Sequence, residues 1–410
     1  MSTAPSEQLK DVLLIGFGAV GAAYSFVLKQ GGRARLTVVA RSNYDAVNAK
    51  GLDFKSRKYG EHLGWRPHRL FPTIEKALDR PYEYVVLATK AVPEIRRNPD
   101  LLRPLLSAPY ADTHPQPTYV LLQNGLNVEV DLYAALQALR PAEEPRIIST
   151  AVWIGAVAVS GDTVEHGDFD RVRLGIYRPS TTDTSTTPAQ AAALADFTAL
   201  LAEGGSEAIV VPEIQRIKFS KNLWNGVFGA SAALSRASLR AFFRPPHLEP
   251  SRAADPTPTS SELAAESTRE VLEVQANPSV QATQSIPHAS PSIGAYTIPF
   301  LHDTLSEVYA LGTALFPATA SAPGLEADLV ATTLARTAAL HAVPESVHLP
   351  SMLVDAYAER PMEVEHVVGE VVRMARKAGV PVPRMETLYA LLLVNQNQFL
   401  RKQREGKLPQ

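Results

Sequence analysis

Cysteine is absent from the 410 residues of this chain. Its absence excludes disulfide bonds, thiol nucleophiles and thiolate metal sites, and it fits a reducing compartment, so we expect a cytoplasmic protein. The chain also lacks a run of about 18 apolar residues, the length that a membrane-spanning helix needs. Residues 1–10 carry no charged segment followed by an apolar run. We therefore expect neither a secretory signal nor a membrane partner.

An excess of one charge sign is missing as well. The 40 Lys and Arg residues oppose 42 Asp and Glu residues, which gives a formal net charge of -2. Proteins that bind nucleic-acid phosphates normally carry a basic surface, so we expect no nucleic-acid partner. The 10 histidines show no metal-binding spacing such as H-E-x-x-H, and we expect no metal site.

Short apolar runs alternate with helical patterns through the first half of the chain. Several of these runs are apolar on both faces, which is typical of buried parallel strands. The alternation predicts βαβ units and therefore a doubly wound, mostly parallel sheet, an α/β Rossmann domain. We expect strands at 11–15, 35–39, 84–88, 118–122 and 146–153, helices at 19–30, 94–107 and 126–139, and an antiparallel extension over 154–177 with turns at 160–162 and 166–168.

A polar stretch rich in Ser, Thr and Pro at residues 179–188 is typical of a linker. It predicts a Rossmann domain over residues 1–178 and an all-α domain over residues 189–410. A second Pro-, Ser- and Thr-rich stretch, at about 244–298, is expected to be a surface insertion with a short helix at 261–274. The helices expected in the second domain span 189–204, 212–240, 299–315, 326–341, 361–378 and 385–402.

A glycine-rich segment follows the first expected strand directly and precedes a helical pattern. In this context the first glycine allows a tight turn, the second lets the backbone approach a pyrophosphate, and the third lets the helix pack closely on the strand. The N-terminus of the helix offers N–H groups and a positive dipole end to phosphates. The candidate dinucleotide-binding residues are Gly16, Phe17, Gly18, Ala19, Val20 and Gly21.

Three further residues follow the ends of expected strands, where cofactors lie in such sheets. Arg41 stands after the second strand, where an Asp or Glu would serve a cofactor without a 2′-phosphate. A guanidinium suits a 2′-phosphate, so we expect NADP, although a solvated surface arginine would look the same. Lys90 and Asn124 are candidates for contacts with the cofactor. The dipeptide Asn124–Gly125 is equally typical of a plain turn.

Six segments, taken in their order along the chain, resemble the ketopantoate reductase (2-dehydropantoate 2-reductase) family. They cover most of the chain outside residues 179–210 and 244–298. The resemblance implies NADPH-dependent reduction of ketopantoate, a small keto acid, in pantothenate biosynthesis. The segments are GFGAVG (16–21), TKA (89–91), QNG (123–125), KNLWNGVFGASAAL (221–234), SMLVDAYAERPMEVEHVVG (351–369) and AGVPVPRMETLYALL (378–392).

The resemblance also implies the catalytic and substrate-binding residues. Lys221 occupies the position of the family's catalytic lysine and would be the general acid, and Glu363 would hold that lysine or the substrate. Asn225 comes four residues after Lys221, which places both on one face of a helix. Asn225 and Ser351 would bind the substrate, and Asp355 would support them rather than react.

Two other functions stay open, another substrate because of Gly229 and the long insertion at about 244–298, and a role without catalysis. Gly229 stands where the family has a second asparagine, so the substrate could be another keto acid. A non-catalytic NADP-binding sensor would preserve the same fold. Taken singly, Lys221 and Glu363 have charged neighbours in sequence and are typical of solvated helix faces. We expect Glu363 in the first turn of a helix that begins at Pro361, and we leave a homodimer open.

Overall fold

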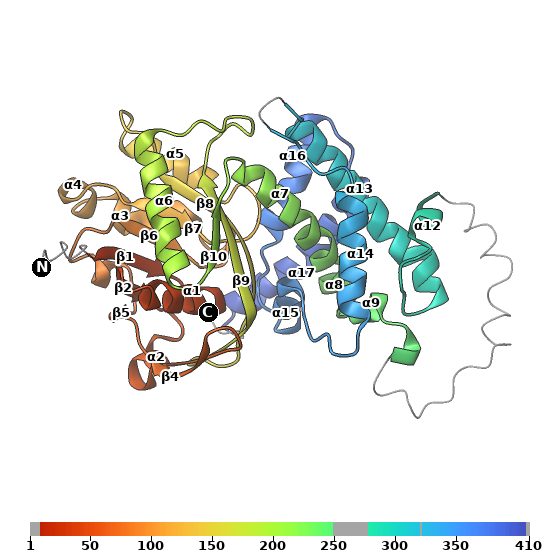
Figure 1. Cartoon of the computed structure of the whole chain (residues 1–410), viewed down its shortest axis with the longest axis horizontal. Coiled ribbons are helices and arrows are strands. Elements are labelled where there is room, and N and C mark those ends of the chain that lie inside the picture. The colour runs from red at the N-terminus through yellow and green to blue at the C-terminus, as the bar shows by residue number, and fades with distance from the viewer. Residues whose placement is uncertain (1–8, 249–277, 320–321, 407–410) are drawn as a thin grey trace, which may run out of the picture. The chain divides into compact units, whose positions relative to one another are not determined.

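A computed structural model describes residues 9–248, 278–319 and 322–406 (Figure 1). Contacts divide the chain into two compact units, and the boundary lies between Lys218 and Phe219, inside helix α7 (Ile214–Trp224). The expected linker at 179–188 therefore lies within the first unit, not between the two. The reason is that the next segment adds a helix and a strand to the first unit, namely α6 (Pro188–Glu203) and β10 (Glu207–Val210).

A ten-stranded sheet forms the core of the first unit. The strand order is β4-β3-β9-β8-β7-β6-β1-β2-β5, and β10 pairs with β9. Six neighbouring strands run parallel to one another, namely β8, β7, β6, β1, β2 and β5. By contrast, β9 is antiparallel to β8, and β4 is antiparallel to β3. The expected doubly wound, mostly parallel sheet is confirmed. The strands are β1 (Lys10–Ile15), β2 (Ala34–Val39), β3 (Leu52–Ser56), β4 (Gly60–Trp65), β5 (Arg69–Phe71), β6 (Tyr84–Leu87), β7 (Thr118–Leu121), β8 (Ile147–Ala158) and β9 (Thr163–Ile176).

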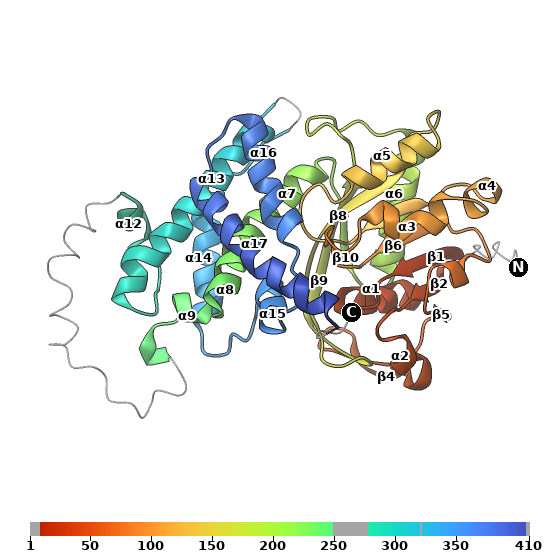
Figure 2. The same ribbon diagram turned by 180° about the vertical axis from the view of Figure 1, so that it is seen from behind.

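Helices cover both faces of this sheet because its central strands are apolar on both sides. In β1, Val12 and Leu14 join the core beneath α1 and α6, whereas Leu13 and Ile15 join the core beneath α3 and α5. Figures 1 and 2 show these two helical layers from opposite sides. The helices named here and the shorter ones beside them are α1 (Ala19–Gln30), α2 (Tyr44–Lys50), α3 (Asn98–Leu106), α4 (Tyr110–Thr113) and α5 (Val130–Leu139).

Two local features differ from the sequence-based expectation. The sequence analysis does not predict β3, β4 and β5, of which β4 is largely exposed and lacks the apolar alternation of a buried strand. The turn expected at 166–168 is wrong, since these residues lie inside β9. His166 there is 4% exposed, and its Nδ1 lies 2.8 Å from the Ser56 hydroxyl, so the ring holds β9 beside β3.

The described part of the second unit is helical, as expected. Its first long helix continues from α7 through a π-helical turn and ends at Arg236, which adopts a left-handed backbone conformation with φ of 53°. The short helix expected at 261–274 lies outside the described residues. The helical elements are the π turn Asn225–Gly229, α8 (Ala230–Ser235), α9 (Arg240–Phe243), the short helix Pro246–Leu248, α12 (Pro278–Thr283), the π turn Ile293–Thr297, α13 (Ile298–Leu315), α14 (Leu329–Ala342), α15 (Ser351–Tyr357), the π turn Glu365–Gly369, α16 (Glu370–Ala378) and α17 (Pro383–Arg404).

Two histidines and two arginines lie together in the second unit. His341 of α14 is 0% exposed, and its ring centroid lies 5.7 Å from that of His348. Burial lowers the pKa of His341 from its usual 6.5 to about 4, and the charges of His348, Arg240 and Arg244 add to this effect. Folding therefore favours the neutral imidazole of His341.

This depressed pKa predicts a loss of stability in mild acid. The contribution of neutral His341 is fully present above the unfolded pKa of 6.5 and is lost as the pH falls towards about 4, because the unfolded chain then binds the extra proton. We expect the melting temperature of His341→Gln to fall less between pH 7.5 and pH 4.5 than that of the unchanged protein. Thermal unfolding across this range measures the difference. The control, His302→Gln on α13, should retain the full pH dependence, and equal pH dependence in all three proteins would contradict the prediction.

Candidate functional site

The glycine-rich turn after β1 is built by close backbone contacts. Gly16 has a φ of 99°, and a Cβ on it would lie 2.7 Å from the Thr89 nitrogen. A Cβ on Gly21 would lie 1.9 Å from the Gly16 oxygen, so α1 approaches the turn too closely for any side chain. In contrast, a Cβ on Gly18 would meet no atom within 4 Å. The protein itself therefore leaves space at Gly18, where a bound pyrophosphate would approach the backbone.

The N-terminus of α1 faces this turn without a side-chain cap. Gly18 is the N-cap residue, and it has no side chain to bond the first N–H groups of the helix. The first turn, which begins at Ala19 and Val20, contains no acidic residue. Unpaired N–H groups and the positive end of the helix dipole therefore remain for an anion. Phe17 is 3% exposed and stacks on Trp65, which fixes the turn from its inner side.

Arg41 lies just beyond the end of β2, the strand beside β1. Its side chain is exposed, and its carbonyl accepts a hydrogen bond from the Tyr44 nitrogen at 3.4 Å. Sequence reasoning missed Asn43 nearby, whose Nδ2 donates to the Phe17 carbonyl at 2.8 Å. This bond ties the loop that carries Arg41 to the glycine-rich turn. An Asn two residues after a strand-end arginine could have suggested it.

Lys90 and Asn124 follow the ends of β6 and β7, which are successive neighbours of β1 in the sheet. Lys90 is exposed, and Asn124 is half-buried. Gln123 donates from Nε2 to the Thr89 hydroxyl at 3.2 Å and exchanges two hydrogen bonds with the Asn98 amide at 2.8 and 3.0 Å. The carboxyl ends of β7, β6, β1 and β2 thus bring these residues to one edge of the sheet with the glycine-rich turn and Arg41.

In the second unit, two π turns lie beside the expected catalytic segment. Lys221 is in the last turn of α7, and Asn225 begins the π turn Asn225–Gly229. The buried Asn222, which sequence reasoning missed, donates from Nδ2 to the Val367 carbonyl in the other π turn at 2.8 Å. Gly226 permits this approach, since a Cβ on it would lie 3.3 Å from the same carbonyl. Single π turns occur often at functional sites.

Ser351 and Asp355 lie on α15, which packs against α8 and against the π turn that follows α7. Ser351 is exposed, whereas Asp355 is 2% exposed and pairs with Arg360, its Oδ1 lying 3.3 Å from Nη2. Asp355 therefore braces the turn after α15. A Cβ on Gly229 would lie 3.8 Å from the Met352 Cβ, an ordinary contact distance, so the smaller residue leaves room beside the start of α15.

Glu363 lies just before its helix and not in the first turn, so the expected start at Pro361 is wrong. The helix begins at Val364, and the Glu363 carbonyl accepts from the Val367 nitrogen at 3.0 Å. The Gln396 side chain of α17 makes two hydrogen bonds to the backbone of Met362. Its Oε1 accepts from the Met362 nitrogen at 2.8 Å, and its Nε2 donates to the Met362 carbonyl at 3.0 Å. This buried glutamine fixes the backbone at Met362, next to Glu363, which is 8% exposed.

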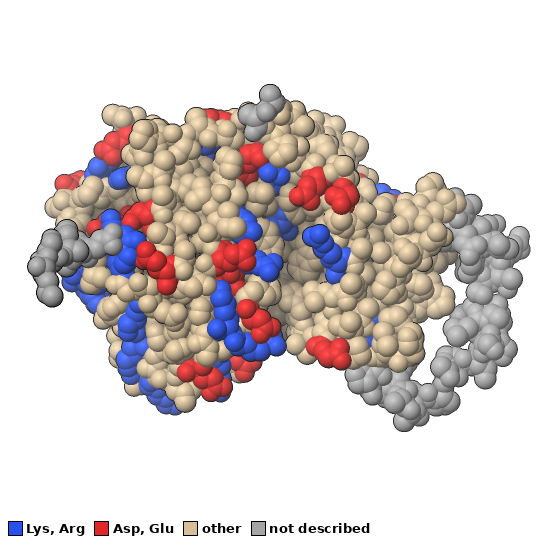
Figure 3. All heavy atoms as spheres, viewed as in Figure 1, with Lys and Arg blue, Asp and Glu red and all other residues tan. Residues whose placement is uncertain are grey.

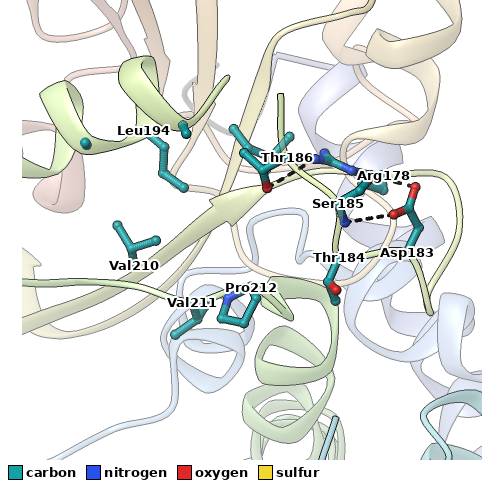
Figure 4. Close-up of a pocket in the computed structure, with 12 residues that line it drawn as sticks. Arg178, Asp183, Thr184, Ser185, Thr186, Leu194, Val210, Val211 and Pro212 are labelled. Atoms are coloured by element: carbon teal, nitrogen blue, oxygen red, sulfur yellow. Dashed lines mark hydrogen bonds and ion pairs between the residues drawn. The ribbon is translucent and has the colours of Figure 1, made fainter. Parts of the chain in front are cut away.

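A pocket of about 270 Å³ lies elsewhere in the first unit, between the end of β9, the loop before α6, and β10 (Figure 4). Arg178 lies at the polar end of the pocket and is 6% exposed. Its Nε lies 3.8 Å from Asp183 Oδ2, and its Nη2 donates to the Thr186 hydroxyl at 3.4 Å. None of its lining residues belongs to the glycine-rich turn or to the loops after β1, β2, β6 and β7. Because Arg178 and Asp183 neutralise each other, we assign this pocket no part in the chemistry.

Further observations concern membranes, metals and surface charge. Among the described residues, no helix combines the length and apolar character that a membrane span requires. In the same residues, no three His, Asp or Glu side chains cluster as metal ligands would. Figure 3 shows Lys and Arg interspersed with Asp and Glu on the left and middle of the visible face. Ion pairs such as Arg33–Asp196, at 3.3 Å, contribute to this mixed surface.

The fold and the glycine-rich turn define the class, a protein with a dinucleotide-binding Rossmann domain followed by a helical domain. Comparison with protein families makes the assignment finer. The model described as "Ketopantoate reductase PanE/ApbA" matches residues 12–179, and the one described as "Ketopantoate reductase PanE/ApbA C terminal" matches residues 213–396. The chain belongs to the ketopantoate reductase family. It is an NAD(P)-dependent oxidoreductase that acts on a CH–OH group.

Individual relatives are distant but match over almost the whole length. An uncharacterized protein of Saccharomyces cerevisiae is 24% identical, covering 98% of this chain and 97% of its own. The crystal structure of 2-dehydropantoate 2-reductase from Methylococcus capsulatus is 23% identical, with a TM-score of 0.65 over 95% of this chain and 97% of that one. A D-mandelate dehydrogenase bound to NADH and anilino(oxo)acetate is 16% identical, with a TM-score of 0.64 over 95% and 99%. At these identities the solved structures show a shared fold.

The different surroundings of Gly18 and Gly21 predict different effects of the same substitution. Gly18→Ala should keep the melting temperature within about 2 °C, because its methyl meets no protein atom, yet weaken dinucleotide binding about 10-fold or more by blocking the pyrophosphate. Gly21→Ala should lower the melting temperature strongly, because its methyl would overlap the Gly16 carbonyl. Thermal unfolding and cofactor titration by fluorescence measure both effects. Normal cofactor affinity in Gly18→Ala would show that no pyrophosphate approaches this backbone.

Proposed function

We propose that this protein reduces a 2-oxoacid to the 2-hydroxyacid with NADPH, with 2-dehydropantoate as the leading candidate substrate. The observation that carries the proposal is the uncapped N-terminus of α1 beside the open space at Gly18, within a chain that belongs to this family. Bound NADPH supplies the hydride. The protein must hold that cofactor, orient the keto acid and deliver a proton to its oxygen.

The residues around the glycine-rich turn suit NADPH. The backbone at Gly18 and the first turn of α1 would hold the pyrophosphate. Arg41 would pair with the 2′-phosphate, because its guanidinium is exposed after β2 and its loop is tied to the turn by Asn43. Lys90 and Asn124, after β6 and β7, would contact the ribose and the nicotinamide half.

Lys221 would act as the general acid. As the carbonyl carbon is reduced, negative charge grows on its oxygen, and the ammonium stabilises that charge and gives it a proton from Nζ. Glu363 would hold the ammonium or the substrate in place. Asn225 and Ser351 would donate hydrogen bonds to the substrate, while Asp355 supports the turn after α15 through its pair with Arg360.

One observation favours a substrate other than 2-dehydropantoate. Gly229 leaves room beside Met352, where the family's second asparagine would place an amide. A site with fewer polar groups would accept a more apolar keto acid, and D-mandelate dehydrogenase, which carries an aromatic keto-acid analogue, shares the fold. A second candidate function is therefore reduction of a bulkier 2-oxoacid by the same residues.

The cofactor preference depends on Arg41. We expect Arg41→Asp to weaken NADPH binding about 10- to 100-fold, because one charge-assisted contact becomes a repulsion, and to leave NADH binding nearly unchanged. Fluorescence titration with both cofactors measures this. Arg103→Asp, which makes the same charge change on the exposed side of α3, is the control and should affect neither. Equal losses for NADPH and NADH would show that Arg41 does not recognise the 2′-phosphate.

The catalytic role depends on Lys221. We expect Lys221→Ala to lower kcat by about 10²- to 10⁴-fold, the usual contribution of a positioned general acid, while NADPH still binds. Lys377→Ala, an exposed lysine at the end of α16, should behave like the unchanged protein. The assay follows NADPH oxidation with 2-dehydropantoate and with branched and aromatic 2-oxoacids. Absence of turnover with every keto acid, despite NADPH binding, would favour a cofactor sensor over an enzyme.

A further inference from the structure

Three buried polar side chains meet beside the sheet of the first unit. Lys218 of α7 and Ser149 of β8 both donate hydrogen bonds to the same carboxylate oxygen, Oε1 of Glu129. The exposed fractions are 6% for Lys218, 2% for Glu129 and 0% for Ser149. The two charged partners are 89 residues apart in the sequence, so only the fold brings them together.

Burying both charges is costly, and stability alone does not require them. Taking two ions out of water offsets much of their attraction, and a buried pair can often be replaced by apolar side chains without loss. Removing one partner alone is strongly destabilising, because the other charge stays buried. What the pair adds is direction, since an ammonium held by one carboxylate oxygen fixes the first half of α7 in one orientation.

The carboxylate of this pair is itself held in place. Glu129 follows the Gln123–Asn124–Gly125 loop and occupies the N-cap position of α5, where its side chain makes no capping hydrogen bond. The Asn98 amide bridges the loop by donating from Nδ2 to the Gln123 side chain at 2.8 Å and to the Val128 carbonyl at 2.9 Å. Glu129 therefore lies at a defined place relative to the carboxyl end of β7.

Lys218 and Lys221 are three residues apart on α7, so they project from neighbouring positions of one helix. We propose that Glu129 and Lys218 are positioning residues for the reaction, which set the orientation of α7 and hence the direction in which Lys221 is presented. The proposal rests on the function proposed above. Lys218 does not touch the substrate in this scheme, and it acts only through the helix.

The test compares Lys218→Met, Glu129→Gln, the double variant and Lys218→Arg. We expect Lys218→Met and Glu129→Gln each to lower kcat about 10- to 100-fold, the size of effect that a small misplacement of a reacting group produces. The Kd for NADPH and the KM for the keto acid should stay within about threefold, and the melting temperature of both single variants should fall. Lys218→Arg keeps the charge and should recover part of kcat. Lys402→Met, which removes the lysine of the exposed Lys402–Glu359 pair, is the control and should leave kcat unchanged.

The double variant separates positioning from stability. It leaves no buried unpaired charge, so its melting temperature should return towards that of the unchanged protein, while kcat remains low because the directional contact is gone. Recovery of kcat together with the melting temperature would overturn the positioning role and leave a structural pair. Normal kcat in Lys218→Met would overturn it as well. A lack of turnover by the unchanged protein would instead overturn the proposed function, and this proposal with it.

Discussion

The close approach of α1 to the turn after β1 is the contact on which the rest of the first unit depends. Because Gly21 lies directly against the Gly16 carbonyl, and Gly16 against Thr89 after β6, the helix begins at the carboxyl edge of the sheet with its N–H groups exposed there. The loops after β2, β6 and β7 meet at the same edge. Backbone packing thus brings the N-terminus of α1, Arg41 and the loops that carry Lys90 and Asn124 to one edge of the sheet.

In the second unit, buried side chains rather than backbone packing fix the candidate residues. Three of its candidate residues lie at irregular points of the backbone: Asn225 on a π turn, Ser351 at the start of a short helix and Glu363 just before another helix. Buried amides hydrogen-bond to the backbone at such points, Asn222 to the Val367 carbonyl and Gln396 to Met362. The helices supply the frame, and these side chains fix the irregular segments between them. Such bracing is what an active site needs to hold its groups in one geometry.

The sequence predicted the central strands and most helices because their apolar patterns are strong and local. It also predicted the roles of Gly16 and Gly21, which the close contacts at both positions support. It did not predict β3, β4 and β5, which are short and lie at the two ends of the sheet, β4 and β3 at one end and β5 at the other. It also placed a turn inside β9, where a register shift opposite Ile154 disturbs the pairing. The boundary between the two units lies after Lys218 and not at the expected linker, residues 179–188. The reason is that β10, which follows this polar stretch, pairs with β9, which precedes it.

By itself the sequence determined what depends on neighbouring residues: the glycine turn, the alternation of buried strands, and the spacing of Lys221 and Asn225 along a helix. Tertiary structure decided the partners of buried polar groups, such as Glu129 with Lys218 and Asn222 with the Val367 carbonyl 145 residues away. The physical reason is that a hydrogen bond needs its two atoms within about 3 Å, and only the completed packing of helices and sheet brings such distant residues that close.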